Sequence, residues 1–308
     1  MIRYTIEDIK KLEEYINIYE FSDEILNTIN TIAKRVGSSN YIKTPVFIKQ
    51  NKIKPKPKPI ESDKEIMLKE IQSILNKMSS KTYEKLKNDI FKLINSINDL
   101  KNNISSTGEL SNGESSDNKI SMNEISEKIF NTASGSKINP NIYADLYKEL
   151  SEIYPSFIED CSRFYEVNIN QFNNIHLRDS NKDYETFCKD NIENQKIRSL
   201  LLFYIELSKR SVIELDSVLN ILDILTTKLE YYIDKYLEND NPCSEYVENI
   251  YLIVTNSYEN IYNLDKWSGI YDRLKNVKNF DKNKNINLTG KVKFKLMDIL
   301  DFVEKKCK

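Results

Sequence analysis

Apolar side chains recur every three or four residues from Ser62 almost to the end of the chain, which is the period of an amphipathic α-helix. No segment alternates apolar and polar residues as a half-buried strand would. Glycine is scarce, at 6 of 308 residues, about 2% where ~7% is usual, so folds that need many tight turns or glycine-rich phosphate loops are excluded. We therefore expect an all-α fold of antiparallel helical pairs, with divergent helical-hairpin repeats stacked as a solenoid as the best fit.

Three regions differ along the chain. Residues 1–36 carry two helical stripes, and Ser22 is a candidate cap for the second of them. Residues 37–61 form a predicted linker, because the Lys-Pro run at 54–59 fits neither a helix nor a central strand and favours an extended polyproline segment. Residues 62–308 form the predicted helical domain, interrupted at about 101–121 by a Ser-, Asn- and Gly-rich stretch that we expect to be a disordered loop.

Polar breaks divide the helical domain into successive apolar stripes. Prolines at Pro140, Pro155 and Pro242 mark three of these breaks. The stripes predict helices around residues 68–78, 83–97, 125–130, 143–150, 157–164, 197–207, 215–237, 247–261, 270–277 and 288–303.

The inventory of reactive residues argues against catalysis. The only histidine, His176, lies in a polar, Asn-rich stretch where we expect a loop residue. The four cysteines, Cys161, Cys188, Cys243 and Cys307, contain no C-x-x-C pair, so a zinc site of ordinary spacing is excluded and reduced thiols are expected. No phosphate-loop motif, signal peptide or membrane-length apolar run occurs. We expect a protein that is not an enzyme, uses no metal or cofactor, and works by contact.

Four segments then carry a resemblance to a known family. They are I-L-N-K-M-S-S-K-T-Y at 74–83, I-F-N-T-A at 129–133 with Y-A-D-L at 143–146, F-Y-I-E-L-S-K at 203–209, and G-K-V-K-F-K-L-M-D-I-L-D-F at 290–302. In this order they resemble the middle domain of translation initiation factor 4 gamma. The resemblance covers residues 62–305 and implies a HEAT-like solenoid of about five helical repeats that serves as a scaffold of the cap-binding 4F complex.

The resemblance implies a first contact with one lobe of a DEAD-box 4A-like RNA helicase at Leu75, Met78 and Tyr83. Met78 and Tyr83 stand where the family has Leu and Phe, so apolar size is kept and the contact is retuned rather than lost. Ser80 replaces the family's Pro. Residues of a helical stripe also form cores, and that interpretation stays open for Leu75 and Met78.

A second helicase contact is implied near the last motif, at Lys293 and Asp298, for which a plain solvated helix face is the alternative. Beside them, Phe294, Met297 and Leu300 are predicted to be core residues. Two separated contacts would hold both helicase lobes at a set spacing and shift the helicase toward its closed, RNA-competent population.

The N-terminus resembles the Y-x-x-x-x-L-Φ motif that docks on a cap-binding 4E-like protein. Tyr4 and Ile9 keep the spacing of five, and Leu12 would replace the apolar partner because Lys10 stands in its usual position. A chance match within an amphipathic helix is the alternative. The lysines Lys54, Lys56 and Lys58 are candidate contacts for RNA phosphates, weak and salt-sensitive, although solubility explains them as well.

Taken with the charge of −2, these features favour a cytoplasmic translation scaffold, a monomer within a heteromeric complex, that touches mRNA weakly or indirectly and no membrane. The frequent use of Asn, Ile and Lys indicates an AT-rich genome, such as that of a large DNA virus or a protist. For a viral protein the expected location would be the host cytoplasm or a viral factory. Two alternatives remain open. One is an adaptor of nuclear cap-binding, splicing or mRNA-decay machinery that binds another helicase or RNA, and the other is a plain helical interaction module.

Overall fold

The computed structural model describes residues 21–35, 62–106, 120–233, 235, 240–280 and 287–307, without the side chains of 63 and 98–106. The chain divides into two units, Met1–Pro59 and Ile60–Lys308. In the described part of the first unit, the helix α2 (Asp23–Arg35) begins directly after Ser22, whose carbonyl accepts hydrogen bonds from the backbone N–H groups of Ile25 and Leu26.

All regular elements of the described second unit are helices, which confirms the predicted all-α class. Their bounds are α3 (Asp63–Leu75), α4 (Tyr83–Ser106), α5 (Met122–Ser134), α6 (Pro140–Ile153), α7 (Ser156–Asn168), the 3-10 helix η2 (Ile169–Asn173), α8 (Tyr184–Lys209), α9 (Leu215–Ile233), α10 (Cys243–Ile261), α11 (Asp265–Lys278) and α12 (Gly290–Lys306). None of the helices in the described ranges is long and apolar enough to cross a membrane.

Local sequence explains where several helices begin. The Ser121 hydroxyl accepts from the N–H of Glu124 while the Glu124 carboxylate accepts from the N–H of Ser121, which is a reciprocal capping box. Thr289 caps α12 by accepting from the N–H of Val292, and Pro140 occupies the first turn of α6, where its missing N–H costs nothing.

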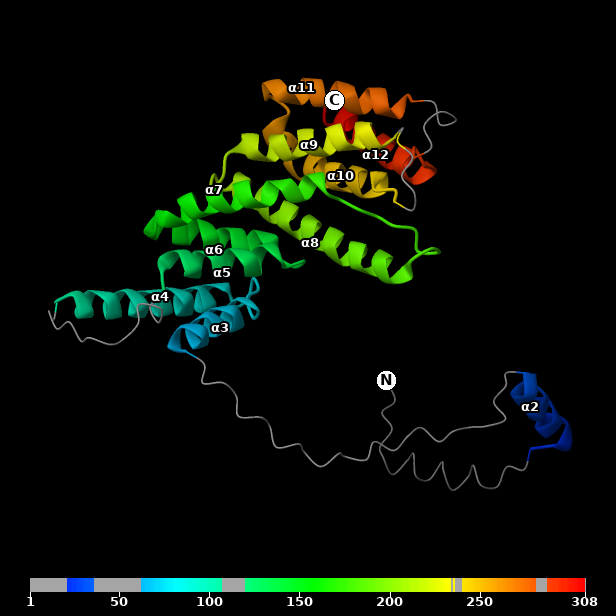
Figure 1. Cartoon of the computed structure of the whole chain (residues 1–308), viewed down its shortest axis with the longest axis horizontal. Helices are drawn as coiled ribbons and strands as arrows, with labels where there is room; N and C mark the ends of the chain where they lie inside the picture. Colours follow the sequence, from blue (N-terminus) through cyan, green and yellow to red (C-terminus); the bar gives the residue numbers. More distant parts are fainter. Residues whose placement is uncertain are drawn as a thin grey trace. The chain divides into compact units, whose positions relative to one another are not determined.

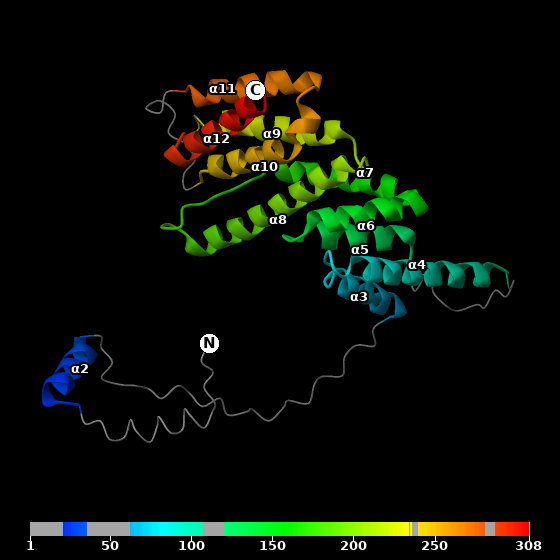
Figure 2. The same ribbon diagram turned by 180° about the vertical axis from the view of Figure 1, so that it is seen from behind.

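Neighbouring helices pack in two series (Figure 1). The pairs α3–α4, α5–α6, α9–α10 and α11–α12 pack within themselves, while η2 and a loop separate α7 from α8. Beyond the pairs, α3 packs on α5, α5 on α7 and α9 on α11, and likewise α6 on α8, α8 on α10 and α10 on α12. Seen from behind, the same order runs from α3 and α4 at one end to α11 and α12 at the other (Figure 2).

One continuous core runs through this stack, and its centre is aromatic. The ring of Phe130 lies 4.8 Å from that of Phe164 and 5.5 Å from that of Phe203. Tyr147 is fully buried beside them, with its hydroxyl 3.2 Å from the carbonyl oxygen of Phe157, to which it donates. Burying polar tips with partners keeps such rings in the core without an unpaired dipole.

Ion pairs join each even-numbered helix to the next across the outside of the core. They are Lys87–Glu149 (2.8 Å), Asp145–Arg210 (2.6 Å), Arg198–Glu245, Glu248–Lys295 (3.1 Å) and Glu259–Lys306 (2.7 Å). At least one ion pair therefore joins each two successive even-numbered helices from α4 to α12. A shift of one of these helices along the next would break the ion pair between them.

Two boundaries differ from the predicted ones. The stretch 101–121 is predicted to be a disordered loop, but α4 extends into it as far as Ser106, and the next helix begins after Ser121; residues 107–119 of the predicted loop lie outside the described residues. The apolar spacing Ile97, Leu100, Ile104 already extends the α4 stripe, and it outweighs the weak helix preference of Asn and Ser there. Helix α8 begins at Tyr184 rather than near Ile197, since Asp183 caps it through the N–H of Thr186.

Candidate functional site

Leu75 and Met78 lie in the hydrophobic core. Leu75 ends α3 with no exposed side-chain area, and Met78, in the following turn, is 6% exposed. The Tyr143 hydroxyl on α6 donates to the carbonyl oxygen of Leu75 at 3.0 Å, which fixes the end of α3. The prediction that these two side chains offer an apolar contact surface is therefore corrected: the period that identifies a helix also places these residues on its inner face.

Tyr83, the third residue of the predicted contact, is half-buried at the start of α4. Its hydroxyl donates to Oε1 of Glu149 at 2.8 Å, and Nζ of Lys87 lies 5.1 Å from the centre of its ring. Burial and then the hydrogen bond to Glu149 raise the pKa of the Tyr83 phenol above its ordinary value, so it stays neutral. The residue as a whole keeps part of its area at the surface.

The turn between α3 and α4 presents a polar surface next to Tyr83. Thr82 organises it, because its hydroxyl accepts from the N–H of Ser79 at 2.9 Å and donates to the carbonyl of Lys77 at 2.9 Å. Asn76, Lys77, Ser80 and Lys81 are exposed. At this end the chain therefore offers a hydrogen-bonded, basic loop beside the half-buried Tyr83.

The surface near the last motif is more distinctive. Phe294, expected to be core, is 68% exposed on the second turn of α12. The core face of α12 carries Val292, Leu296, Ile299, Leu300 and Val303. Phe294 lies two residues from Val292 and from Leu296, which turns it about 200° away from that face at 100° per residue. Of its neighbours, Leu300 is buried as predicted and Met297 is partly buried.

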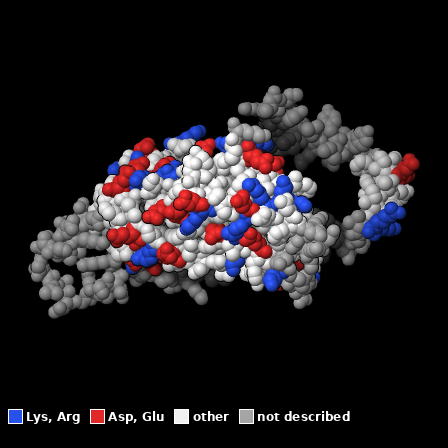
Figure 3. All heavy atoms as spheres, turned by 90° about the horizontal axis from the view of Figure 1, so that it is seen from above, with Lys and Arg blue, Asp and Glu red and all other residues white. Residues whose placement is uncertain are grey.

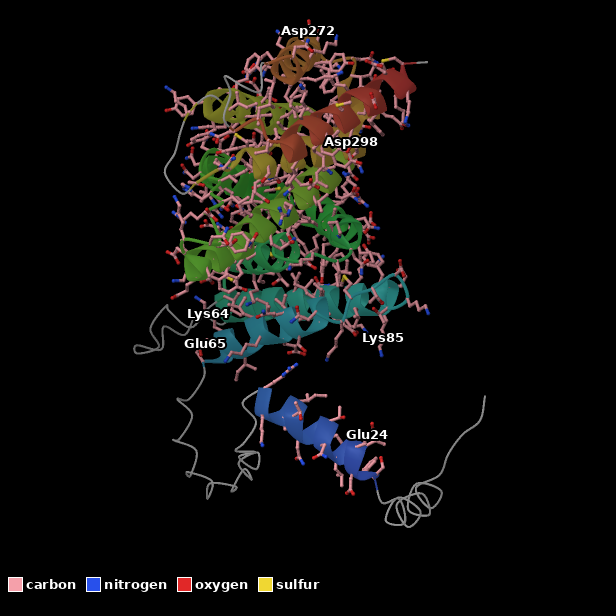
Figure 4. All side chains as sticks on the ribbon, turned by 90° about the vertical axis from the view of Figure 1, so that its right-hand side faces the viewer. Glu24, Lys64, Glu65, Lys85, Asp272 and Asp298 are labelled. Atoms are coloured by element: carbon pink, nitrogen blue, oxygen red, sulfur yellow. The ribbon has the colours of Figure 1, made fainter. Side chains whose placement is uncertain are left out.

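Two unpaired charges flank this exposed ring. Lys293 is half-exposed and Asp298 is exposed one turn beyond Phe294 (Figure 4), and neither has an ion-pair partner among the described residues. Lys295, in contrast, lies against the ring of Tyr251 (4.2 Å to its centre) and pairs with Glu248. Lys293, Phe294 and Asp298 together, which we call the α12 patch, combine an aromatic anchor with one charge of each sign.

A groove that no sequence pattern predicted lies between α7 and α9. It has a volume of about 820 Å³, and its lining includes Glu166, Lys209, Asn220 and the loop residues 211–214. Ser211 in this loop has a left-handed backbone (φ 56°). An adjoining hollow of about 360 Å³ at the ends of α10 and α12 shares Lys209 and Asn260 with it. The lining mixes hydroxyl and amide groups with the charged side chains of Glu166, Lys209 and Glu214 and with apolar ones.

His176 lies in the loop before α8, as predicted, and joins two connections. Its Nδ1 is 2.6 Å from Oδ2 of Asp240 in the α9–α10 connection, and Oδ1 of Asp240 accepts from the N–H of Leu177 at 2.8 Å. The same two connections form an isolated antiparallel β-bridge between Arg178 and Asp240. The geometry gives His176 a structural role, since its contact with Asp240 joins the loop that precedes α8 to the connection that follows α9.

The remaining predicted site residues and reactive groups are placed as follows. Tyr4, Ile9 and Leu12 of the cap-binding-protein motif, and Lys54, Lys56 and Lys58, lie outside the described residues.

The four cysteines are free thiols; burial raises the pKa of Cys161 and of Cys243 to about 12. On the face seen in Figure 3, basic and acidic side chains are interspersed rather than gathered into a track of one sign. Within the described ranges, no three His, Cys, Asp or Glu side chains are placed to hold a metal ion.

Comparisons with family models and with curated proteins find no match for this sequence.

Proposed function

We propose that the chain is a translation initiation scaffold that bridges a cap-binding 4E-like protein and a DEAD-box 4A-like RNA helicase, stimulating the helicase and recruiting it to capped mRNA. The observation that carries the proposal is the exposure of Phe294. A phenylalanine that is 68% exposed, flanked by Lys293 and Asp298 without ion-pair partners among the described residues, offers a partner an aromatic anchor. It falls within the motif that the family resemblance assigns to the helicase.

The proposal includes a finer architecture, a HEAT-like solenoid of five hairpins: α3–α4, α5–α6, α7–α8, α9–α10 and α11–α12. Support comes from the packing of α3 on α5, α5 on α7 and α9 on α11, and of α6 on α8, α8 on α10 and α10 on α12, as expected where stacked hairpins bury a shared core. The Tyr83 loop then belongs to the first hairpin and the α12 patch to the last, so the two helicase contacts are held apart by the full stack.

A scaffold with two separated contacts would act by shifting the helicase population toward one conformational state. The helicase opens and closes two lobes, and a scaffold that binds both lobes at one spacing stabilises only the state with that spacing. The continuous core and the ion pairs between successive even helices keep this spacing fixed. No catalytic residue is required, because the free energy comes from the preferential binding of one helicase state.

The cap-binding side of the proposal rests on the motif at Tyr4, Ile9 and Leu12 alone. The proposed location of the chain, in the cytoplasm or in a viral factory, follows from the same translation role. Contact with mRNA is weak or indirect, in keeping with the net charge of −2 and the mixed charges of Figure 3.

Binding experiments test the two sides separately. The full chain should retain a DEAD-box translation helicase on a column, and Phe294→Asp should weaken that binding by at least ~30-fold, the loss typical of an interface anchor. Glu185→Ala, which removes an 83%-exposed side chain on α8 outside the motifs assigned to the helicase, is the control and should bind as the wild type does. A peptide of residues 1–20 should bind a 4E protein and lose it with Tyr4→Ala; helicase binding without 4E binding would favour a nuclear or decay adaptor.

A further inference from the structure

The groove between α7 and α9 lies where the stacking of the odd-numbered helices changes. Elsewhere in this series neighbouring helices pack directly, α3 on α5, α5 on α7 and α9 on α11. The helices α7 and α9 pack less closely, and η2 packs against both of them. Between them the hydroxyl of Tyr165 on α7 donates to the carbonyl oxygen of Ser217 on α9 at 3.0 Å. The groove therefore follows from the packing of the helices and is pre-formed.

The loop that follows α8 is a fixed part of the lining. The N–H of Ser211 donates to the carbonyl of Ser208, and the N–H of Val212 donates to the carbonyl of Leu207, both at 3.0 Å. With the left-handed backbone of Ser211, these two bonds make a Schellman cap at the end of α8. Because the loop is already ordered, binding here requires little further ordering of the protein.

The charged residues of the lining make the groove acidic. Glu166 and Glu214 are exposed, and neither carboxylate has an ion-pair partner among the described residues. Lys209, which also lines the groove, is already paired with Glu206 at 2.7 Å. An occupant with Lys or Arg side chains can pair with the two carboxylates, whereas the phosphates of RNA would be repelled by them.

The rest of the lining suits an extended segment of protein chain. Val212 is buried and Ile158 is 44% exposed, so an apolar side chain of the occupant has a surface to pack on. Ser162, Asn220 and Asn260 offer hydroxyl and amide groups to the N–H and C=O groups that an extended chain leaves unpaired. The adjoining hollow, which shares Asn260, lengthens the groove toward the ends of α10 and α12.

We infer that this groove binds an extended segment of a partner protein that carries Lys or Arg residues beside an apolar one. The inference goes beyond the proposed scaffold role, because the groove uses none of the residues assigned to the helicase or to the cap-binding protein. A chain that binds no helicase would still bind such a segment here.

A library of random dodecapeptides displayed on phage, selected against the immobilised full chain, tests the inference. The selected peptides should combine Lys or Arg with an apolar residue. The binding of the strongest one is then measured by fluorescence anisotropy. Glu166→Gln together with Glu214→Gln should weaken it about tenfold, about threefold for each lost charge pair. Ser162→Trp, which places a large ring in the groove from an exposed position on α7, should weaken it at least as much.

Glu185→Gln together with Glu193→Gln is the matched control, because it removes two exposed carboxylates from α8 outside the groove and changes the net charge equally. This variant should bind the peptide as the wild type does, and far-UV circular dichroism should show that all three variants are folded. A selection that yields acidic peptides would overturn the inference. So would a basic peptide that the groove variants bind as tightly as the control does.

Discussion

The hydroxyl of Tyr83 at the start of α4 donates a hydrogen bond to Oε1 of Glu149 on α6, with 2.8 Å between the two oxygens. Lys87 binds the same carboxylate, 2.8 Å from Oε2. This links the first hairpin to the second and makes Tyr83 as much a structural residue as a surface one. Its hydroxyl is engaged by Glu149, so a partner would have to use the rest of the half-buried side chain.

Tyr83→Phe should therefore separate stability from binding. It removes the hydroxyl but leaves Glu149 paired with Lys87, so the free energy of unfolding should fall by about 0.5–1 kcal/mol, measured by urea titration. Helicase binding should not change, because the ring is kept. Tyr83→Asp is the contrasting variant: it places a second carboxylate near Glu149 and should cost clearly more. Equal stability of the two variants would contradict this account of the contact.

Substitutions of Leu75 should affect the stability of the fold, as expected for a core residue rather than for an interface residue. Because the side chain is fully buried, Leu75→Ala should lower the free energy of unfolding by about 2–5 kcal/mol. Leu75→Asp should lose far-UV helicity and helicase binding together. Retained helicity with binding lost would return Leu75 to the surface and contradict its burial.

Two ion pairs on α8 should differ sharply in their contribution. Arg198 pairs with Glu245, whose side chain is 9% exposed, while the Glu185 of the Glu185–Lys189 pair is 83% exposed. Glu245→Ala leaves Arg198 partly buried and unpaired, and should cost about 3–5 kcal/mol. Glu185→Ala should stay within about 0.5 kcal/mol of the wild type. Thermal melts of both variants at low and high salt check the contrast, and similar shifts would refute it.

Stability should decline in alkali. Burial holds the pKa of Cys161 and Cys243 at about 12, above the ordinary value of 9.0. Between these values the unfolded chain loses thiol protons that the folded chain keeps, so the folded state binds more protons and loses stability as the pH rises from about 9 toward 12. Buried Tyr147 and Tyr204, whose pKa is also raised by burial, add to the decline at higher pH.

Urea midpoints followed by Trp267 fluorescence should hold steady up to about pH 8.5 and then fall. Cys161→Ala removes one of the titrating groups, so its midpoint should fall less steeply with pH even though the variant starts from a lower value. An unchanged slope would show that this thiol does not take part.

Sequence reasoning recovers those features that local chemistry controls. The helical period gives the all-α class, and proline and cap residues place the starts of helices such as α6 at Pro140. It fails where the same pattern has two outcomes. Leu75 fits a stripe whether the stripe faces the core or a partner, and only the packing of Tyr143 against the end of α3 decides between them.

Phe294 shows the complementary failure. Its apolar character suggests a core position, yet its place relative to Val292 and Leu296 turns it outward. Counting helix angle rather than residue type would have predicted its exposure. The groove beside Ser211 is of another kind, because α7 is distant in sequence from α9 and the loop that precedes it, so no local pattern predicts it.

The measurement that bears most directly on the scaffold role is the rate of ATP-driven RNA duplex unwinding by a DEAD-box translation helicase, with and without this chain. We predict that the wild type and Glu185→Ala increase the rate, and that Phe294→Asp, folded by circular dichroism, leaves it at the level of the helicase alone. A chain that gives no stimulation, or a Phe294→Asp variant that stimulates as fully as the wild type, would contradict the account.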